Sequence, residues 1–118
     1  MRIFISHVKA DAVAAATLAS AIVARGHEVI VRDGNAAALG TADAMVVLVS
    51  PQSIESPFVQ REIEFALASP RFAERLVPVV IAEAADAPWI LRKLPSFPAG
   101  SDLAQTGRRV AEALEKTA

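Results

Sequence analysis

The sequence predicts an α/β fold: a flavodoxin-like parallel sheet of strand order 2-1-3-4-5 with helices on both faces. Three observations lead to this prediction. Short runs rich in β-branched residues alternate with segments of helical pattern along all 118 residues. The run "AMVVLVS" is apolar at every position before its final serine, as expected of a central parallel strand. No linker, repeat or low-complexity tract interrupts the alternation, so we expect residues 1–118 to form one domain.

Five segments have the composition of strands. They are residues 2–6 ("RIFIS"), 27–31 ("HEVIV"), 44–50 ("AMVVLVS"), 75–82 ("RLVPVVIA") and a very short one within 94–97 ("LPSF"). The fourth contains Pro78, and a proline cannot donate a hydrogen bond to the ladder. We therefore expect the fourth strand to lie near an edge of the sheet or to be bulged.

The first helix is predicted over residues 11–25, where helix-favouring residues dominate. Gly26 follows as a C-cap, because glycine readily takes the left-handed conformation that ends many helices. The helical spacing of the apolar residues predicts the stripe that the helix buries. Its expected members are Val13, Thr17, Leu18, Ala21 and Ile22.

The second and third helices are predicted from their first residues. Ser56 and Pro57 suit the N-cap and the first helical position. This helix should end near Ser69, because Pro70 disfavours helix in the residue before it. Asp102 opens the last helix, with Gln105 placed as its capping-box partner. We expect that helix to bury Leu103, Val110 and Leu114.

The composition excludes several classes of function. Hydrophobic residues make up 53% of the chain, its net charge is -1 and its mean hydropathy is +0.39, which argues against disorder. The absence of cysteine excludes disulfides and thiolate zinc sites, and two histidines cannot supply a three-histidine metal site. No run approaches the ~18 apolar residues of a membrane span, and "MRIFISH" lacks a signal-peptide core. Basic pairs at 92–93 and 108–109 are isolated. We expect a cytoplasmic domain that binds neither nucleic acid nor membrane.

In a sheet of this order, ligands bind beyond the carboxyl ends of the strands, between the first strand and the third. Polar or turn-forming residues stand at each of these ends: Ser6 and His7, Asp33 and Gly34, and Ser50 with Pro51 and Gln52. Such residues are also common in ordinary loops, and a histidine in this position is often bonded to backbone rather than acting as a base. "SHVKAD" contains no glycine-rich phosphate loop, and the chain has no GxSxG elbow.

Glu62 is a carboxylate on a helical stripe that otherwise reads as apolar. At about 100° per residue, Phe58 and Phe65 lie about 40° and 60° to one side of Glu62. Val59 and Ala66 lie about 60° and 40° to the other side. Removing a carboxylate from water among such side chains is costly, and placements of this kind cluster at functional sites. The alternative is a glutamate at the helix margin that reaches water or pairs with an arginine.

Four stretches in this order resemble the bacterial branch of the TIR (Toll/interleukin-1 receptor/resistance) domain: "RIFISHVKAD", "EVIVRD", "ADAMVVLVSPQSIESPFVQREIEFAL" and "RLVPVVI". The family opens with a strand reading F-I-S-[HY], followed by small polar residues and an aspartate. Its third strand ends in Leu-x-Ser-Pro. A helix then begins with Ser-x-[WF] and carries a glutamate, a motif that spans Ser56 to Glu62 here. The resemblance covers nearly the whole chain.

The resemblance implies an activity and a set of site residues. In the enzymatic members this glutamate is the catalytic residue of an NAD+ glycohydrolase, which by position is Glu62. The enzyme cleaves the nicotinamide-ribose bond and gives nicotinamide with ADP-ribose or a cyclic ADP-ribose. NAD+ is then the substrate, and neither a cofactor nor a metal is implied. The expected substrate-binding residues are Phe4, Ser6, His7, Asp33 and Phe58, together with Ser50 from the end of the third strand.

The sequence departs from the family after Asp33. TIR domains usually carry a long loop, the BB loop, and a helix before the third strand, but only "GNAAALGT" stands there in this chain. These residues suffice for at most one helical turn. The resemblance further implies a role in antiphage or toxin-like defence, activated by self-association through TIR-TIR contacts or by a partner defence subunit.

Two other functions fit the same residues. One is a TIR interaction module without catalysis, which docks to other TIR domains or partner subunits and in which Glu62 is idle or structural. The other is a related α/β enzyme acting on nucleosides, such as a deoxyribosyltransferase, which also uses a glutamate carried on a helix.

Overall fold

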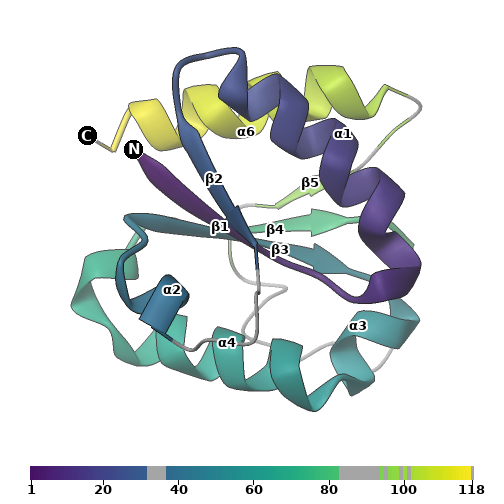
Figure 1. Ribbon diagram of the computed structural model, residues 1–118, viewed down its shortest axis with the longest axis vertical. Helices are drawn as coiled ribbons and strands as arrows, with labels where there is room; N and C mark the ends of the chain where they lie inside the picture. Colours follow the sequence, from purple (N-terminus) through teal and green to yellow (C-terminus); the bar gives the residue numbers. More distant parts are fainter. Residues whose placement is uncertain (32–36, 83–93, 95, 99, 101, 118) are drawn as a thin grey trace.

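Five parallel strands form the middle layer of the molecule (Figure 1). The computed structural model describes residues 1–31, 37–82, 94, 96–98, 100 and 102–117. The strands are β1 (Arg2–Ser6), β2 (Glu28–Val31), β3 (Ala44–Val49), β4 (Leu76–Val80) and β5 (Phe97–Pro98). Their order is β2-β1-β3-β4-β5, and every neighbouring pair is parallel. The predicted fold class and strand order are confirmed.

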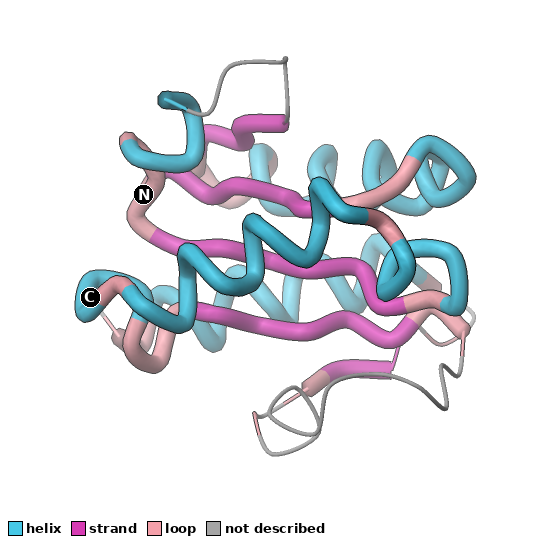
Figure 2. The backbone as a smooth tube through the Cα atoms, turned by 90° about the horizontal axis from the view of Figure 1, so that it is seen from below, coloured by secondary structure: helices cyan, strands magenta, loops and turns pink. Residues whose placement is uncertain are grey.

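Helices cover both faces of this sheet. On one face lie α1 (Ala12–Val23) and α6 (Leu103–Glu115), and on the other lie α2 (Ala37–Gly40), α3 (Pro51–Glu55) and α4 (Pro57–Ala68) (Figure 1). Two 3-10 turns, η1 (Lys9–Asp11) and η2 (Pro70–Phe72), precede α1 and follow α4. Figure 2 shows the strands side by side, with the short β5 at one edge of the sheet. Within the described ranges, no helix has both the length and the apolar character needed to cross a membrane.

The alternation of side chains along the strands divides the core into two clusters. Ile3 and Ile5 of β1 pack with α1 and α6, whereas Phe4 packs with the residues that α4 buries. Successive residues of a strand point to opposite faces of the sheet. Ser6 therefore shares the face of Phe4, which is the face that α4 covers. This parity places a polar side chain at the end of β1 directly beneath α4.

Ser-Pro pairs begin three successive helical segments between residues 50 and 72. Ser50 precedes α3, Ser56 precedes α4 and Ser69 precedes η2, each with proline at the start of the segment. The hydroxyls of Ser50 and Ser56 accept hydrogen bonds from backbone N–H groups of the first turn. The predicted start of α4 is confirmed, but α3 was not predicted. The third strand ends at Val49, so Ser50 is a helix N-cap rather than the last residue of a strand.

Two members of the predicted buried stripe of α1, Val13 and Thr17, are not buried, and Thr17 is only partly covered. Val13 is 82% exposed, and the residues of α1 that are buried are Ala15, Leu18, Ala21 and Ile22. Helix α1 carries no charged residue from Ala12 to Val23. Apolar periodicity alone therefore cannot distinguish its inner face from its outer face. The predicted C-cap is consistent with the structure, since Gly26 has a φ of 90°.

The sheet edge beside β4 has the expected form. β4 contains Pro78 and lies next to the two-residue strand β5, which pairs with Val79 and Val80. Asp102 caps α6 by accepting a hydrogen bond from the backbone N–H of Gln105. On the opposite edge, α2 is a helix of four residues, so the expected single turn after the second strand is confirmed.

Candidate functional site

The candidate site lies where the carboxyl ends of β1 and β3 meet, below the first turns of α4. These two strands are neighbours in the sheet, with Ser6 opposite Val47. Position 50, at the N-cap of α3, follows β3 at the same end of the sheet, and position 62 lies in the middle of α4. Residues expected at the site from three separate segments are thus brought to one end of the sheet, at the switch point where such folds bind ligands.

Ser6 and Glu62 are joined by a hydrogen bond. The Ser6 hydroxyl donates to Oε1 of Glu62 over 2.7 Å, across 56 positions of sequence. Ser6 has no exposed surface, while Glu62 is partly exposed at the margin of α4. The carboxylate is therefore held by the end of β1, on a residue that is itself partly exposed. Two of the predicted site residues are thus in direct contact.

The buried face of α4 differs from the predicted arc around Glu62. The residues that α4 buries are Val59, Ile63 and Ala66. Phe58 is 59% exposed and Phe65 is 42% exposed, so neither belongs to the core. Glu62 consequently lies between a buried stripe and two exposed aromatic rings, rather than at the centre of the buried face. Apolar residues flank Glu62 on both sides as predicted, but those on one side are exposed, because burial is centred near Ile63.

Ser50 has a structural set of contacts. Its hydroxyl donates to Oδ2 of Asp11 over 2.7 Å and accepts from the backbone N–H of Ser53 over 3.1 Å. The Ser53 hydroxyl in turn accepts from the backbone N–H of Ser50 over 2.8 Å, which completes a capping box. Ser50 and Ser53 are both buried. These bonds fasten α3 and the turn before α1 to the end of β3.

Asp11 was not among the predicted site residues. Its carboxylate lies at the same end of the sheet as Ser50, with which it is hydrogen-bonded. The signal for it was in the sequence, since the opening motif of the resembled family ends in an aspartate after small polar residues. A strand-end search does not find it, because Asp11 stands several residues beyond the end of β1.

The remaining predicted site residues are placed differently. Phe4 is 1% exposed and packs in the core beneath α4, so it stands behind Ser6 rather than on an open surface. His7 is partly buried, with Nδ1 3.3 Å from the carbonyl oxygen of Ile5. This contact matches the expectation of a histidine bonded to backbone. Asp33 lies outside the described residues.

The described chain also has a hollow away from Ser6. This hollow of about 260 Å³ is lined by residues 66–70 at the end of α4, by η2 and its neighbours, and by Leu94. Among the described residues that line it, most are apolar and the one carboxylate is that of Glu74. Among the described residues, no three His, Asp or Glu side chains converge in a way that could hold a metal ion.

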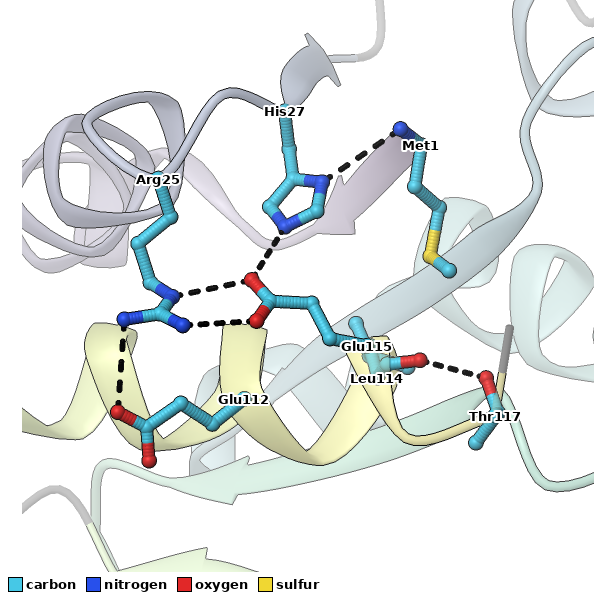
Figure 3. Close-up of polar contacts among 7 residues, drawn as sticks. All are labelled: Met1, Arg25, His27, Glu112, Leu114, Glu115 and Thr117. Atoms are coloured by element: carbon cyan, nitrogen blue, oxygen red, sulfur yellow. Dashed lines mark hydrogen bonds and ion pairs between the residues drawn. The ribbon is translucent and has the colours of Figure 1, made fainter.

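A polar cluster joins the turn after α1 to the end of α6 (Figure 3). Arg25 donates to both oxygens of Glu115 over 2.7 and 3.0 Å, and Nε2 of His27 lies 2.7 Å from the same carboxylate. The hydrogen bonds from Arg25 and then from His27 lower the pKa of Glu115 to about 2. Glu112 adds a longer contact to Arg25, at 3.5 Å. The charged side chains of this cluster bond to one another and hold the end of α6 in place. We therefore regard the cluster as structural.

Solved structures that resemble the chain support the fold alone. A diflavin flavoprotein A3 from Nostoc sp. is 15% identical, with a TM-score of 0.56 over 99% of this chain and 91% of that one. A flavodoxin from Streptococcus pneumoniae TIGR4 is 12% identical, with a TM-score of 0.54 over 99% of this chain and 97% of that one. No curated protein matches the chain.

The family is shown by a match along the sequence. The family model described as the TIR domain matches residues 3–116, which is nearly the entire chain. The matched range contains both partners of the Ser6–Glu62 hydrogen bond. It agrees with the order of motifs from the first strand to the glutamate-bearing helix. The chain therefore belongs to the TIR domain family.

Proposed function

We propose that this TIR domain is an NAD+ glycohydrolase in which Glu62 is the catalytic residue. The observation that carries the proposal is the Ser6–Glu62 hydrogen bond at the carboxyl end of the sheet, which holds a partly exposed carboxylate at the switch point. TIR domains include enzymes that cleave NAD+, so family membership and site geometry support the same reaction.

The chemistry suits a single fixed carboxylate. The bond between the ribose C1′ and the nicotinamide nitrogen breaks, and nicotinamide leaves as a neutral base with the bonding electron pair. Positive charge develops on the ribose, as it does in glycoside hydrolysis. A carboxylate already in place beside that charge stabilises the transition state more than the ground state. A water oxygen then bonds to C1′ and releases a proton to solvent, which gives ADP-ribose. Attack by the adenine of the same molecule gives a cyclic product instead.

The exposed aromatic ring next to Glu62 fits the substrate. Phe58 lies one helical turn before Glu62 and presents more than half of its surface to solvent. An aromatic face can stack on the nicotinamide or adenine ring and hold the ribose near the carboxylate. We assign Phe58 to substrate binding, while Ser50 and Phe4 support the site from within the fold.

We further propose that the reaction takes place in the cytoplasm, in antiphage or toxin-like defence, and that self-association activates it. TIR domains commonly self-associate or bind other TIR proteins. The large exposed apolar residues of α4 include Phe65 and Leu67 beside Phe58, and they are available for such contacts.

The second candidate is a TIR interaction module without catalysis. The observation that favours it is α2, which is a single turn of four residues. In the family this region usually carries the loop and helix that cover the substrate. With so short a connection, little of the chain would cover a substrate bound beside Glu62. The same domain would then act only by docking to another TIR domain or a partner subunit.

Incubation with NAD+ separates these two functions. Nicotinamide release is followed at low protein concentration and again under concentrated or crowded conditions, with light scattering to report assembly. The glycohydrolase produces nicotinamide, and produces it faster per molecule when assembled. An interaction module produces none in any state, and its complexes survive Glu62→Ala. Absence of turnover in samples shown to be assembled would refute the proposed enzyme.

A further inference from the structure

Ser6 is a buried donor directed at the carboxylate of a partly exposed residue. Its hydroxyl lies 2.7 Å from Oε1 of Glu62, and its own surface is completely covered. A ligand arriving from solvent therefore reaches Glu62 but not Ser6. The sequence predicted Ser6 to bind substrate. Its burial instead places it in contact with Glu62 and away from the ligand.

The two partners differ in how firmly the fold holds them. Ser6 ends β1, which is paired on one side with β2 and on the other with β3, where Ser6 stands opposite Val47. Glu62 projects from the margin of α4 on a long side chain with three rotatable bonds. A hydrogen bond from the rigid partner to the flexible one restricts the carboxylate to the rotamers that keep it in place.

We infer that Ser6 is a positioning residue: its hydroxyl holds the Glu62 carboxylate in the orientation that meets the developing charge on the ribose. This inference rests on the proposed function and concerns the same site. Misplacement of a catalytic group by about 1 Å can reduce a rate by about 100-fold without any loss of substrate contacts. Loss of the hydroxyl should therefore lower kcat rather than raise KM.

A second serine at the same end of the sheet supplies the matched control. Ser53 is also buried, and its hydroxyl donates to the carbonyl oxygen of Ser50 over 3.1 Å and accepts from the backbone N–H of Ser50. Ser53→Ala deletes a buried hydroxyl close to the site without touching Glu62. We expect Ser53→Ala to lower the melting temperature while kcat stays within about twofold of the wild-type value, because the hydrogen bonds of the Ser53 hydroxyl go to the backbone of Ser50.

The experiment is a double-mutant cycle measured by nicotinamide release. Ser6→Ala is expected to lower kcat by about 10- to 100-fold, with KM changed less than threefold. Ser6→Thr keeps a hydroxyl and is expected to recover most of that loss. In a Glu62→Asp background the shorter side chain no longer meets the Ser6 hydroxyl. There Ser6→Ala should have almost no further effect, because the two residues act as one unit.

The possible results separate this inference from the proposed function. If Ser6→Ala lowers kcat equally in the Glu62 and Glu62→Asp backgrounds, or leaves kcat unchanged, Ser6 is not a positioning residue. The proposed glycohydrolase activity is unaffected by that result. If the wild-type protein releases no nicotinamide in any assembled state, the proposed function fails and the inference fails with it. Should Ser6→Ala not fold, Ser6→Cys replaces it in the cycle, since a thiol is of similar size and a weak donor.

Carboxyl ¹³C NMR of glutamate-labelled protein gives a readout that does not depend on turnover. The resonance of Glu62, assigned by its loss in Glu62→Gln, is expected to shift in Ser6→Ala and to keep its wild-type position in Ser53→Ala. An unchanged Glu62 resonance in Ser6→Ala would show that the hydroxyl does not hold the carboxylate in solution. That result would overturn the inference whatever the activity.

Discussion

The hydroxyl of Ser50 donates a 2.7 Å hydrogen bond to Oδ2 of Asp11, and this bond ties the end of β3 to the turn that leads into α1. The same oxygen caps α3 by accepting from Ser53. Two segments that border the candidate site thus depend on one buried hydroxyl. Because Ser50 is held in this way, the sheet end is fixed before any ligand binds.

Replacement of Ser50 should therefore cost stability. Ser50→Ala removes a helix cap and a donor to a carboxylate, so we expect the free energy of unfolding to fall by about 1–3 kcal/mol. Urea unfolding followed by circular dichroism measures the loss. Ser56→Ala is the control, since the bond that the Ser56 hydroxyl accepts from the backbone N–H of Val59 is long, at 3.4 Å. A loss in Ser56→Ala as large as that in Ser50→Ala would contradict this account of the Ser50 contacts.

The ion pairs of Glu115 predict an acid-sensitive contribution to stability. Arg25 and His27 lower the pKa of Glu115 from 4.5 to about 2 in the folded protein. A lowered folded-state pKa gives stability that is fully present above the unfolded value and is lost as the pH falls toward the folded value. The contribution should therefore decline between about pH 4.5 and pH 2. Above this window we expect wild-type protein to be more stable than Glu115→Gln.

Thermal unfolding from pH 7 to pH 2 tests this dependence. The difference in melting temperature between wild-type protein and Glu115→Gln should shrink steadily once the pH falls below about 4.5. Glu64→Gln serves as the control, because Glu64 is an exposed residue of α4. A difference between wild-type and Glu115→Gln that stays constant from pH 5 to pH 2 would show that the ion pairs do not act in this way.

Gly107 lies where α6 packs tightly against α1. A Cβ atom at this position would lie 2.7 Å from the Cβ of Ala21 and 3.1 Å from the carbonyl oxygen of Leu18. Alanine usually favours helix over glycine by about 1 kcal/mol. Here the overlap should outweigh that gain, and we expect Gly107→Ala to lower stability by about 1–2 kcal/mol. Chemical unfolding measures the change.

The compensating variant shows whether the overlap is responsible. Gly107→Ala combined with Ala21→Gly removes the nearest clashing atom, and it should be more stable than the sum of the two single variants predicts. Strict additivity of the two changes would indicate that the contact between α1 and α6 is not the cause.

The two exposed rings of α4 are expected to have different roles. Phe65 packs edge-on against Phe72, with ring centroids 6.1 Å apart, whereas Phe58 stands beside Glu62. Phe58→Ala should raise KM for NAD+ by about 5- to 100-fold, the usual effect of losing a ring that stacks on a base. Its effect on stability should be small. Phe65→Ala should instead lower stability by about 0.5–1.5 kcal/mol and leave KM unchanged. Steady-state kinetics and urea unfolding of both variants test this division.

Much of the fold could be predicted from local signals in the sequence. The strands are short β-branched runs, and Ser56 and Asp102 were recognised as N-caps because a side-chain oxygen followed by a helical pattern has a direct physical meaning. Helix α3 was missed although Ser50 and Pro51 carry the same signal, because the pair was interpreted as the end of a strand. The buried face of α1 was predicted only in part, since no charged residue on its outer face distinguishes that face from the inner one.

The candidate site was less accessible to sequence reasoning. Ser6 and Glu62 were each predicted, one from the end of a strand and the other from its place on a helix. Their contact depends on tertiary structure, because it requires both the parity of β1 and the rotation of α4. The exposure of Phe58 depends on that same rotation, which burial of Ile63 sets. Phe4 and Ser50 proved to be buried supports for the same reason: only packing decides which strand-end residues remain open.

The central claim is tested most directly by nicotinamide release from NAD+ in wild-type protein and Glu62→Gln, with Glu64→Gln as the control from the same helix. Each protein is assayed at a concentration where assembly has been verified. We expect Glu62→Gln to reduce the rate by at least about 100-fold while keeping the wild-type melting temperature. Glu64→Gln should retain the wild-type rate. A Glu62→Gln protein that releases nicotinamide as fast as the wild type would contradict the proposed role of Glu62.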